Sequence, residues 1–311
     1  MSMKIAKLTK NGMEIVEKEI PVMGSGEVLI KSAACGICEG DVYHYKRVTK
    51  SGSNEELFLG HEGTGTIVAM GEGVTGFVEG DMVTTSLGGA YGEYFVTLAE
   101  RLTKVPEGFS PEHIVGEAVS CCAYSARNAR VRNGDRVAVI GCGFMGILII
   151  AFVKKIYGAG EVLAVDPIGW RRELAECYGA DRSTSPEDIN LQKDYFDVVI
   201  EATGVSSALN TAAEMVITQG RLTIVGFHQS EGGQRCVDMK LWNLKALEVT
   251  SGHCKRPLWK KDALQKALPY IVSGEIDLKG LVTIYKFDDI DKAFKEIADG
   301  RKGLLKASLV F

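Results

Sequence analysis

The pattern of apolar and polar positions changes near residue 118. Before that point, short apolar runs rich in β-branched residues are separated by glycines and polar turns, and long helical periodicity is lacking. This pattern is typical of a small, irregular and partly closed β-domain, which we assign to residues 1–118. The expected strands are 3–8, 13–16, 27–32, 65–70, 81–85, 90–97 and 102–106.

Beyond residue 118, strand-like apolar runs alternate with helical periodicity. This alternation predicts an α/β fold, a doubly wound parallel sheet, over residues 119–265. We expect residues 266–311 to return to the β-domain, so that the doubly wound unit is an insertion in it. The expected strands are 136–140, 162–165, 196–201, 221–225, 244–251, 281–286 and 305–311, and the expected helices are 118–128, 144–157, 172–178, 206–217, 261–272 and 287–299.

A glycine motif follows the first strand of the doubly wound unit. Gly141, Gly143 and Gly146 form G-x-G-x-x-G between an apolar strand and an apolar helix. The first glycine permits the tight turn, the second lets a pyrophosphate approach the backbone, and the third lets the helix pack close to the strand. In this context the motif predicts a dinucleotide-binding (Rossmann) unit.

The acid that completes the motif is Asp166, at the end of the second strand and 20 residues after Gly146. A carboxylate there accepts hydrogen bonds from a ribose 2′-hydroxyl and repels a 2′-phosphate, which favours NAD over NADP. Arg171 and Arg172 follow closely and are able to hold a phosphate, so NADP stays open as the less favoured cofactor.

The composition excludes several classes of function. The chain has 311 residues, 46% of them hydrophobic, and a net charge of −4, with no run of Lys and Arg that would indicate binding to nucleic acid or to a membrane surface. The first residues show no apolar leader, and the longest apolar run is too short to span a bilayer. Eight cysteines in such a chain favour a reducing compartment, and we expect a cytoplasmic location.

The β-rich half carries residue types that bind zinc. Cys38 and Asp41 lie in one glycine-flanked segment, and His61 and Glu62 lie in another. A thiolate, an imidazole and a carboxylate are the ligands of catalytic zinc, which takes three protein ligands and keeps one position open. Cys35 and Cys38 are also spaced C-x-x-C, which fits a redox pair or half of a four-cysteine zinc site, although the sequence has no second such pair.

These residues, followed by the dinucleotide motif, resemble the zinc-dependent medium-chain alcohol and polyol dehydrogenases over essentially the whole chain. Gly60-His61-Glu62 with Gly65 and Gly71 is the most specific part of the likeness. The resemblance is to the branch similar to sorbitol dehydrogenase, and it implies a GroES-like catalytic domain around the Rossmann unit.

The resemblance also implies roles for individual residues. Cys38, His61, Glu62 and Glu117 would hold the zinc, with Asp41 orienting the histidine. Cys121 would contact the nicotinamide, and Lys306 would reach the pyrophosphate. The full set expected to contact the cofactor is Gly141, Gly143, Phe144, Met145, Gly146, Asp166, Arg171, Cys121, Thr203, Val225 and Lys306.

The sequence departs from the family pattern in two places. After residue 83 it lacks the four closely spaced cysteines of a structural-zinc lobe, so we expect one zinc per chain. Two residues past Cys38, where the family usually has a Ser or Thr that passes on the alcohol proton, this chain has Gly40. The proton would then leave through Glu39, Tyr43, His44 or a water molecule, and we count His44 among the candidate catalytic residues.

We therefore expect an NAD-dependent oxidoreductase acting on a secondary alcohol, such as a polyol, cyclitol or sugar. Three alternatives stay open: a redox-neutral epimerase or lyase that oxidises its substrate transiently, a metal-free reductase, and an NAD-binding protein without turnover. By resemblance we expect a homodimer or homotetramer that pairs through residues 244–251.

Overall fold

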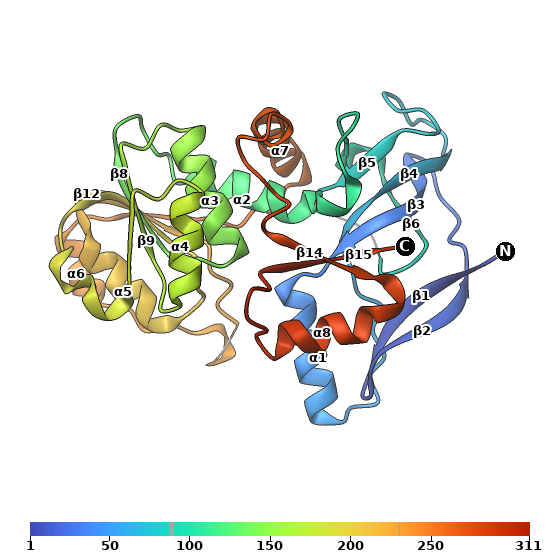
Figure 1. Cartoon of the computed structure of the whole chain (residues 1–311), viewed down its shortest axis with the longest axis horizontal. Helices are drawn as coiled ribbons and strands as arrows, with labels where there is room; N and C mark the ends of the chain where they lie inside the picture. The colour runs from blue at the N-terminus through green and yellow to red at the C-terminus, as the bar shows by residue number, and fades with distance from the viewer. Residues whose placement is uncertain (87–89, 230) are drawn as a thin grey trace. The chain divides into compact units, whose positions relative to one another are not determined.

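The computed structural model describes residues 1–86, 90–229 and 231–311 (Figure 1). The chain divides into two compact units, the first made of Met1–Ser120, Arg256–Gln265 and Asp277–Phe311, the second of Cys121–Lys255 and Lys266–Ile276. The boundaries expected from the sequence were 118 and 265. The chain does not simply return to the first unit after residue 265, because one helix, α7 (Pro257–Val272), contributes residues to both units.

The second unit contains a sheet of six parallel strands in the order β10-β9-β8-β11-β12-β13. Numbered along the chain, this order is 3-2-1-4-5-6, that of a doubly wound dinucleotide-binding sheet, and the predicted fold class is confirmed. The strands are β8 (Arg136–Ile140), β9 (Glu161–Val165), β10 (Arg182–Thr184), β11 (Phe196–Glu201), β12 (Val216–Ile224) and β13 (Glu248–Ser251).

Four helices connect these strands: α3 (Phe144–Lys155), α4 (Gly169–Cys177), α5 (Ser206–Met215) and α6 (Met239–Leu244). In Figure 1, α3 and α4 run side by side. The strand expected over residues 244–251 is wrong in its first half, because α6 ends there and β13 begins at Glu248. β10 and α6 are too short to leave a periodic pattern, and the sequence did not predict them.

The first unit contains a mixed seven-stranded sheet, β14-β15-β3-β4-β5-β7, with β6 paired to β3, and a separate hairpin of β1 and β2. The strands are β1 (Ser2–Thr9), β2 (Gly12–Glu19), β3 (Glu27–Gly36), β4 (Glu62–Met70), β5 (Met82–Thr85), β6 (Tyr94–Leu98), β7 (Leu102–Lys104), β14 (Val282–Lys286) and β15 (Lys306–Val310). The C-terminal strands thus join the N-terminal ones in one sheet, as the sequence predicted. The helix α2 (Gly116–Asn128) begins in this unit.

The expectation that residues 1–118 contain no long helix is wrong. Glu39–Ser51 form α1, which packs against α8 (Ile290–Ala298). Its buried apolar side chains are Val42, Tyr45 and Val48, a narrow stripe of three at a spacing of three. A stripe that narrow, in a segment that is otherwise polar, is easily mistaken for a loop.

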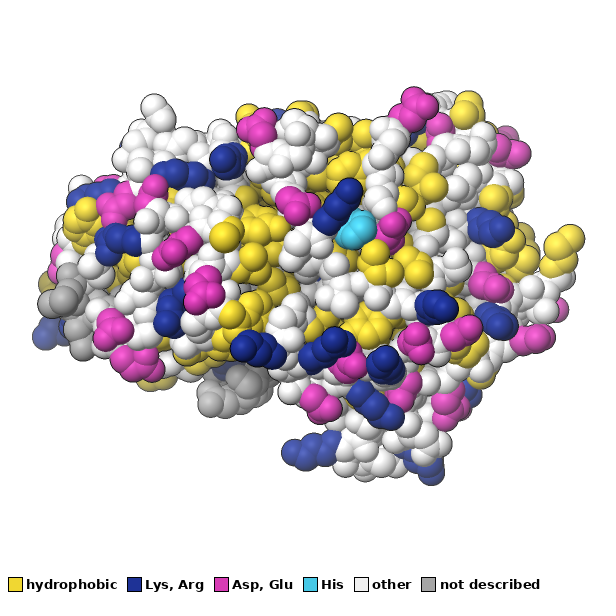
Figure 2. Space-filling model, in the orientation of Figure 1, with side chains coloured by type: hydrophobic (Ala, Val, Ile, Leu, Met, Phe, Trp, Pro, Cys, Tyr) yellow, Lys and Arg dark blue, Asp and Glu magenta, His cyan; other side chains and the backbone are white. Residues whose placement is uncertain are grey.

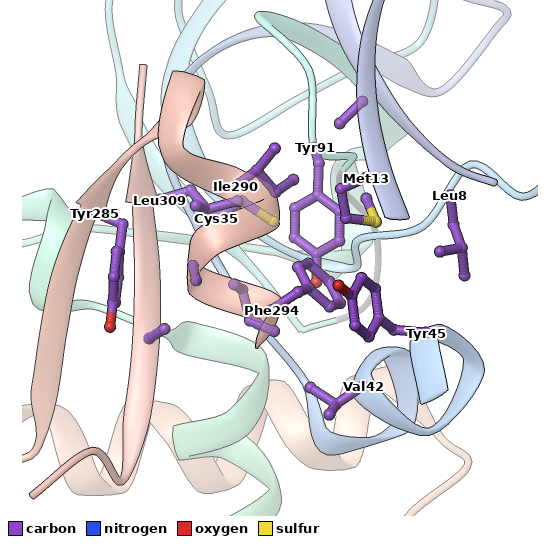
Figure 3. Packing of buried hydrophobic residues seen from close by; sticks show 14 of the residues in the cluster. Leu8, Met13, Cys35, Val42, Tyr45, Tyr91, Tyr285, Ile290, Phe294 and Leu309 are labelled. Atoms are coloured by element: carbon purple, nitrogen blue, oxygen red, sulfur yellow. The ribbon is translucent and has the colours of Figure 1, made fainter. Parts of the chain in front are cut away.

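The core of this unit gathers side chains from distant parts of the sequence. Figure 3 shows Leu8, Met13, Tyr45, Tyr91 and Phe294 packed together. The rings of Tyr45 and Phe294 lie 5.3 Å apart between centroids, and those of Tyr91 and Phe294 lie 5.7 Å apart at 84°. This cluster fixes α1 and the segment around Tyr91, which both reach the candidate site.

The surface agrees with the small net charge. On the face drawn in Figure 2, acidic and basic side chains are interspersed. No helix among the described residues is both long enough and apolar enough to cross a membrane.

Candidate metal and dinucleotide sites

The structure brings three of the predicted zinc ligands together. Within residues 1–86, 90–229 and 231–311, the one group of His, Cys, Asp and Glu side chains able to hold a metal ion is Cys38, His61 and Glu62. Their potential ligand atoms all lie within 4.8 Å of one another. This is the thiolate, imidazole and carboxylate set that the sequence predicted.

Strand register explains how residues so far apart in sequence meet. In the antiparallel pair β3–β4, Gly36 lies opposite Glu62, so the chain leaving β3 reaches Cys38 beside the residues that begin β4. A Cβ atom on Gly36 would lie 2.1 Å from Glu62 Oε2 and 2.7 Å from Val115 Cγ1. Position 36 is therefore restricted to glycine, since any side chain would displace the Glu62 carboxylate.

The two oxygens of Glu62 have different surroundings. The side chain is 1% exposed, and Oε1 accepts a hydrogen bond of 2.7 Å from Lys306 Nζ. Oε2 has no hydrogen-bond partner among the described residues, and a buried polar atom without one costs about 1–3 kcal/mol. Burial raises the pKa of Glu62, Lys306 opposes this, and the charge of Glu117 adds to it. A cation next to Oε2 would satisfy this atom, so the donor set fits a metal ion.

The Cys38 side chain at the N-cap of α1 is a thiol at neutral pH when no metal is bound. Burial, followed by the charge of Glu62, raises the pKa of Cys38 to about 12. Metal ligation requires the thiolate, so metal binding at this site has to displace a proton.

A chain of hydrogen-bonding groups reaches His61 from the core. Asp41 is 5% exposed, and its Oδ2 lies 3.6 Å from His61 Nδ1. Tyr91 donates its hydroxyl to the same Asp41 oxygen at 2.5 Å. A carboxylate on one imidazole nitrogen fixes the ring and leaves the other nitrogen for a metal. The sequence predicted the role of Asp41 by resemblance, but it gave no sign of Tyr91.

The glycine motif of the second unit has the geometry that the sequence predicted. Gly141 has φ = 99°, and a Cβ there would lie 2.8 Å from Thr203 Cγ2. A Cβ on Gly146 would lie 1.8 Å from the Gly141 oxygen, so the helix α3 packs tightly on the turn. A Cβ on Gly143, the N-cap of α3, meets nothing within 4 Å. Gly143 is thus the point where a pyrophosphate can approach the backbone.

Asp166 directly follows β9 and lies against this turn. It is 3% exposed, and its carboxylate accepts hydrogen bonds of 2.8 Å from the backbone N–H groups of Cys142 and Ile168. Arg171 Nη1 lies 4.0 Å from the same carboxylate, whereas Arg172 Nη1 donates to the Asp166 carbonyl at 2.7 Å. The acid is therefore tied to the glycine turn before any ribose is bound.

A buried acid that the sequence did not indicate organises the next loop. Glu201, fully buried at the end of β11, accepts hydrogen bonds from the backbone and hydroxyl of Thr203 at 2.7 and 2.5 Å. His228 Nε2 lies 3.0 Å from the other oxygen of Glu201. The Val225 N–H donates to the Glu201 carbonyl at 2.7 Å. Thr203 and Val225, both expected at the cofactor, are thus held by the same residue, Thr203 by the Glu201 carboxylate and Val225 by the Glu201 backbone carbonyl.

Comparison with known proteins decides the family. The sequence matches the family models described as alcohol dehydrogenase GroES-like domain, over residues 24–107, and zinc-binding dehydrogenase, over residues 145–273. An L-threonine 3-dehydrogenase from Caldanaerobacter subterraneus is 31% identical over 271 residues, which cover 74% of this chain and 77% of that one. The chain belongs to the zinc-dependent medium-chain alcohol dehydrogenase family. It is an oxidoreductase, and zinc and NAD, the cofactors predicted from the sequence, are consistent with this membership.

Other members of the family extend the likeness to the whole chain. The L-threonine 3-dehydrogenase of Pyrococcus horikoshii is 29% identical, covering 97% of this chain and 98% of that one. That alignment runs over 348 positions, whereas this chain has 311 residues, so the relative carries segments that this chain does not. An Escherichia coli protein described as a short chain alcohol dehydrogenase, solved with NADH, superposes with a TM-score of 0.86 at 25% identity, covering 100% of this chain and 99% of that one.

Two of the residues predicted for this family site have partners that the sequence did not indicate. Glu117, at the start of α2, forms a buried ion pair with Lys260 and is not part of the three-residue group. Lys306 is buried against Glu62. The predictions that Glu117 binds the metal and that Lys306 reaches a pyrophosphate stay predictions.

The remaining predicted residues lie as follows. His44 is on α1, with Nδ1 3.5 Å from Arg47 Nη2, and is outside the three-residue group. Cys121 is partly exposed on α2, and Phe144 and Met145 form the first turn of α3. Their predicted roles also stay predictions.

Proposed function

We propose that this chain catalyses the NAD-linked oxidation of a secondary alcohol carried by a polyol, cyclitol or sugar-like molecule. The observation that carries the proposal is the convergence of Cys38, His61 and Glu62, in which the buried Glu62 carboxylate keeps one oxygen, Oε2, without a hydrogen-bond partner among the described residues. A pure nucleotide-binding protein has no need of such a group, and a metal-free reductase has no need of a buried carboxylate oxygen left without a donor.

The roles of the residues follow from their contacts. Cys38, His61 and Glu62 would hold the metal, and Asp41 and Tyr91 would keep the His61 ring in place. When bound, zinc supplies a Lewis acid for the alcohol oxygen, and NAD supplies the hydride acceptor. Three protein ligands leave one position of a tetrahedral site for the substrate.

The dinucleotide assignment depends on the second unit alone. The open space at Gly143 admits a pyrophosphate, and the Asp166 carboxylate, with two acceptor oxygens, favours a ribose 2′-hydroxyl over a 2′-phosphate. Arg171, 4.0 Å from that carboxylate, is the side chain able to weaken the preference for NAD.

The names of relatives support the substrate class. They include L-threonine 3-dehydrogenases and, at 26% identity over 93% of this chain, a 2-dehydro-3-deoxy-L-galactonate 5-dehydrogenase from Pseudoalteromonas atlantica. Both names refer to an internal position of a polar chain, where the hydroxyl is secondary. A secondary hydroxyl on a polar chain is also the reacting group that we propose here.

The first test measures zinc content and turnover in the same preparation. Protein purified without added metal or chelator is expected to hold about one zinc per chain, and to reduce NAD with at least one member of a panel of polyols, cyclitols, sugar acids and hydroxy amino acids. Cys38→Ser should lose both the zinc and the activity, while Cys177→Ser, which alters an exposed cysteine, should lose neither.

Other outcomes would contradict the proposal in distinct ways. Epimerised or dehydrated product without accumulated NADH would indicate the redox-neutral reaction, for which the missing side chain at Gly40 is the motivating observation. Binding of NAD without zinc and without any turnover would indicate a nucleotide-binding protein.

We also propose a homodimer or a dimer of dimers in the cytoplasm. The assembly proposal is supported by the edge position of β13 in its sheet, where the side chain of Val249 is 38% exposed. Elution as a monomer at micromolar concentration would contradict it.

A further inference from the structure

A second buried carboxylate lies beside the three-residue group and has a lysine of its own. Glu117 and Lys260 are 7% and 8% exposed, and their charged ends form a direct ion pair. Both residues belong to the first unit. Burying an ion pair costs desolvation energy, and removing one partner leaves an uncompensated buried charge.

Backbone contacts hold the Glu117 segment against the metal ligands. Thr64, two residues after Glu62 on β4, donates its hydroxyl to the Ile114 carbonyl at 2.9 Å. The Val115 side chain lies next to the Gly36–Glu62 contact, as the short distances to a Cβ on Gly36 show. The charge of Glu117 is close enough to raise the pKa values of both Glu62 and Lys306. The Glu117 side chain thus lies near the ligand group, but its carboxylate forms an ion pair with Lys260.

The charges in and around the site balance only when both lysines are counted. Besides the neutral His61, six side chains in and around the site carry a charge when a metal is bound: Cys38 and Glu62 in the ligand group, Asp41 and Lys306 paired with its members, and the neighbouring pair of Glu117 and Lys260. With the thiol ionised for metal ligation, the four acids carry −4, and the two lysines with a divalent metal carry +4. Lys260 is the cation whose ammonium pairs directly with the Glu117 carboxylate.

We propose that Lys260 is a positioning residue that keeps Glu117 out of the metal's ligand set, so that the fourth coordination position stays open to substrate. This inference rests on the proposed function. Three protein ligands with one open position define a catalytic zinc site, and four protein ligands define a closed, structural one. Lys260 would therefore decide which of the two this chain forms.

The test compares Lys260→Met with Lys261→Met, a matched control on the next residue of α7. Lys261 lies over the ring of Phe77, 5.8 Å from its centroid, and contacts no ligand residue that the structure describes. Zinc affinity is measured by competition with a chromophoric chelator, and the ligand number by X-ray absorption at the zinc edge. The wild-type chain and Lys261→Met should give the same values.

We expect Lys260→Met to bind zinc about tenfold or more tightly, with one additional oxygen ligand from protein, and to lose most of its turnover. The double variant Lys260→Met/Glu117→Gln should return to the wild-type affinity and ligand number, and Lys260→Arg should resemble the wild type. A purely structural role for Lys260 predicts the reverse, weaker zinc binding in Lys260→Met.

Glu117→Gln tests the same idea without removing the lysine and covers the case that Lys260→Met does not fold. If Glu117 is outside the ligand set, this variant should keep its ligand number and bind zinc within about tenfold of the wild type. Loss of one protein ligand in Glu117→Gln, or unchanged affinity and ligand number in a folded Lys260→Met, would overturn the inference. A wild-type chain without zinc would overturn the proposed function itself. If the wild type is active and holds one zinc, a negative result in the variants overturns only the inference about Lys260.

Discussion

Replacing Tyr91 by phenylalanine removes a single hydroxyl from the core and tests whether the Tyr91–Asp41–His61 chain supports metal binding. Tyr91 is fully buried, and its hydroxyl donates to Asp41 Oδ2 at 2.5 Å. Burial, together with the charge of Asp41, raises the pKa of Tyr91 well above its usual value, so the hydroxyl remains a donor wherever the protein is folded. Without it, the Asp41 carboxylate that faces His61 loses a short hydrogen bond.

The expected magnitude follows from two separate arguments. Removing a partner that orients a metal-ligating histidine typically weakens metal binding about 10- to 100-fold, which corresponds to about 1.4–2.7 kcal/mol. A hydrogen bond from a neutral donor to a buried carboxylate contributes about 1.5–3 kcal/mol. Part of the lost hydrogen-bond energy should therefore lower the stability of the zinc-free protein, and the part that depends on the metal-bound His61 should appear as lost zinc affinity.

The assay measures the zinc dissociation constant by chelator competition, and the unfolding midpoint of the zinc-free protein in urea. Tyr45→Phe is the matched control. Tyr45 packs on the same ring of Phe294, and its hydroxyl donates to Asp291 at 3.2 Å, away from the ligands. Both variants should lower the urea midpoint, but only Tyr91→Phe should weaken zinc binding. If the two variants bind zinc equally well, Tyr91 supports the core alone and the argument is refuted.

Three further predictions concern separate features. Zinc binding at pH 7 should release about one proton, that of the Cys38 thiol, because burial raises the pKa of Cys38 in the metal-free protein to about 12, and affinity should therefore rise with pH. Calorimetry in two buffers of different ionisation enthalpy checks this, and release below about half a proton would contradict it. In Asp166→Asn, the preference for NAD, measured as kcat/KM for NAD divided by kcat/KM for NADP, should fall by about tenfold or more, because the charge that repels the 2′-phosphate of NADP is lost. An unchanged preference would refute this role of Asp166. Lys245→Met should lower the free energy of unfolding, measured in urea, by about 2–4 kcal/mol. The Lys245 ammonium donates hydrogen bonds of 2.8 Å to three backbone carbonyls at the end of α5, and these would be lost. A decrease below about 1 kcal/mol would contradict this prediction.

The sequence was most informative where structure is local. The strand, glycine turn and helix around Gly141 are consecutive in the chain, so pattern and composition sufficed to predict them. Cys38, His61 and Glu62 were predicted because their residue types and neighbouring glycines carry a signature. Their meeting depends on the β3–β4 register, in which Gly36 faces Glu62, and a sequence alone does not reveal a register.

The partners of the predicted residues could not be read from the sequence. Lys306 meets Glu62 from 244 residues away, and Lys260 meets Glu117 from 143 residues away. Most lysines are exposed, so nothing in the residue type marks these two as buried. Tyr91 reaches Asp41 across 50 residues, because α1 and the Tyr91 segment share one core. Such pairs follow from tertiary packing, which is where the functional detail of this site lies.

At position 40 this chain lacks the hydroxyl side chain of the family's proton relay, and the structure shows no steric reason for the glycine that replaces it. A Cβ on Gly40 would meet only Cys38 Sγ, at 3.7 Å, an ordinary contact distance, and the backbone there is helical. Glycine in a helix costs about 0.5–1 kcal/mol relative to alanine, so neither space nor backbone conformation favours it at this position. His44, one turn further along α1, has Nδ1 3.5 Å from Arg47 Nη2 and is not a member of the ligand group. The alcohol proton therefore has to leave by a route that does not pass through a side chain at position 40, which leaves Glu39, Tyr43, His44 or a water molecule as its carrier.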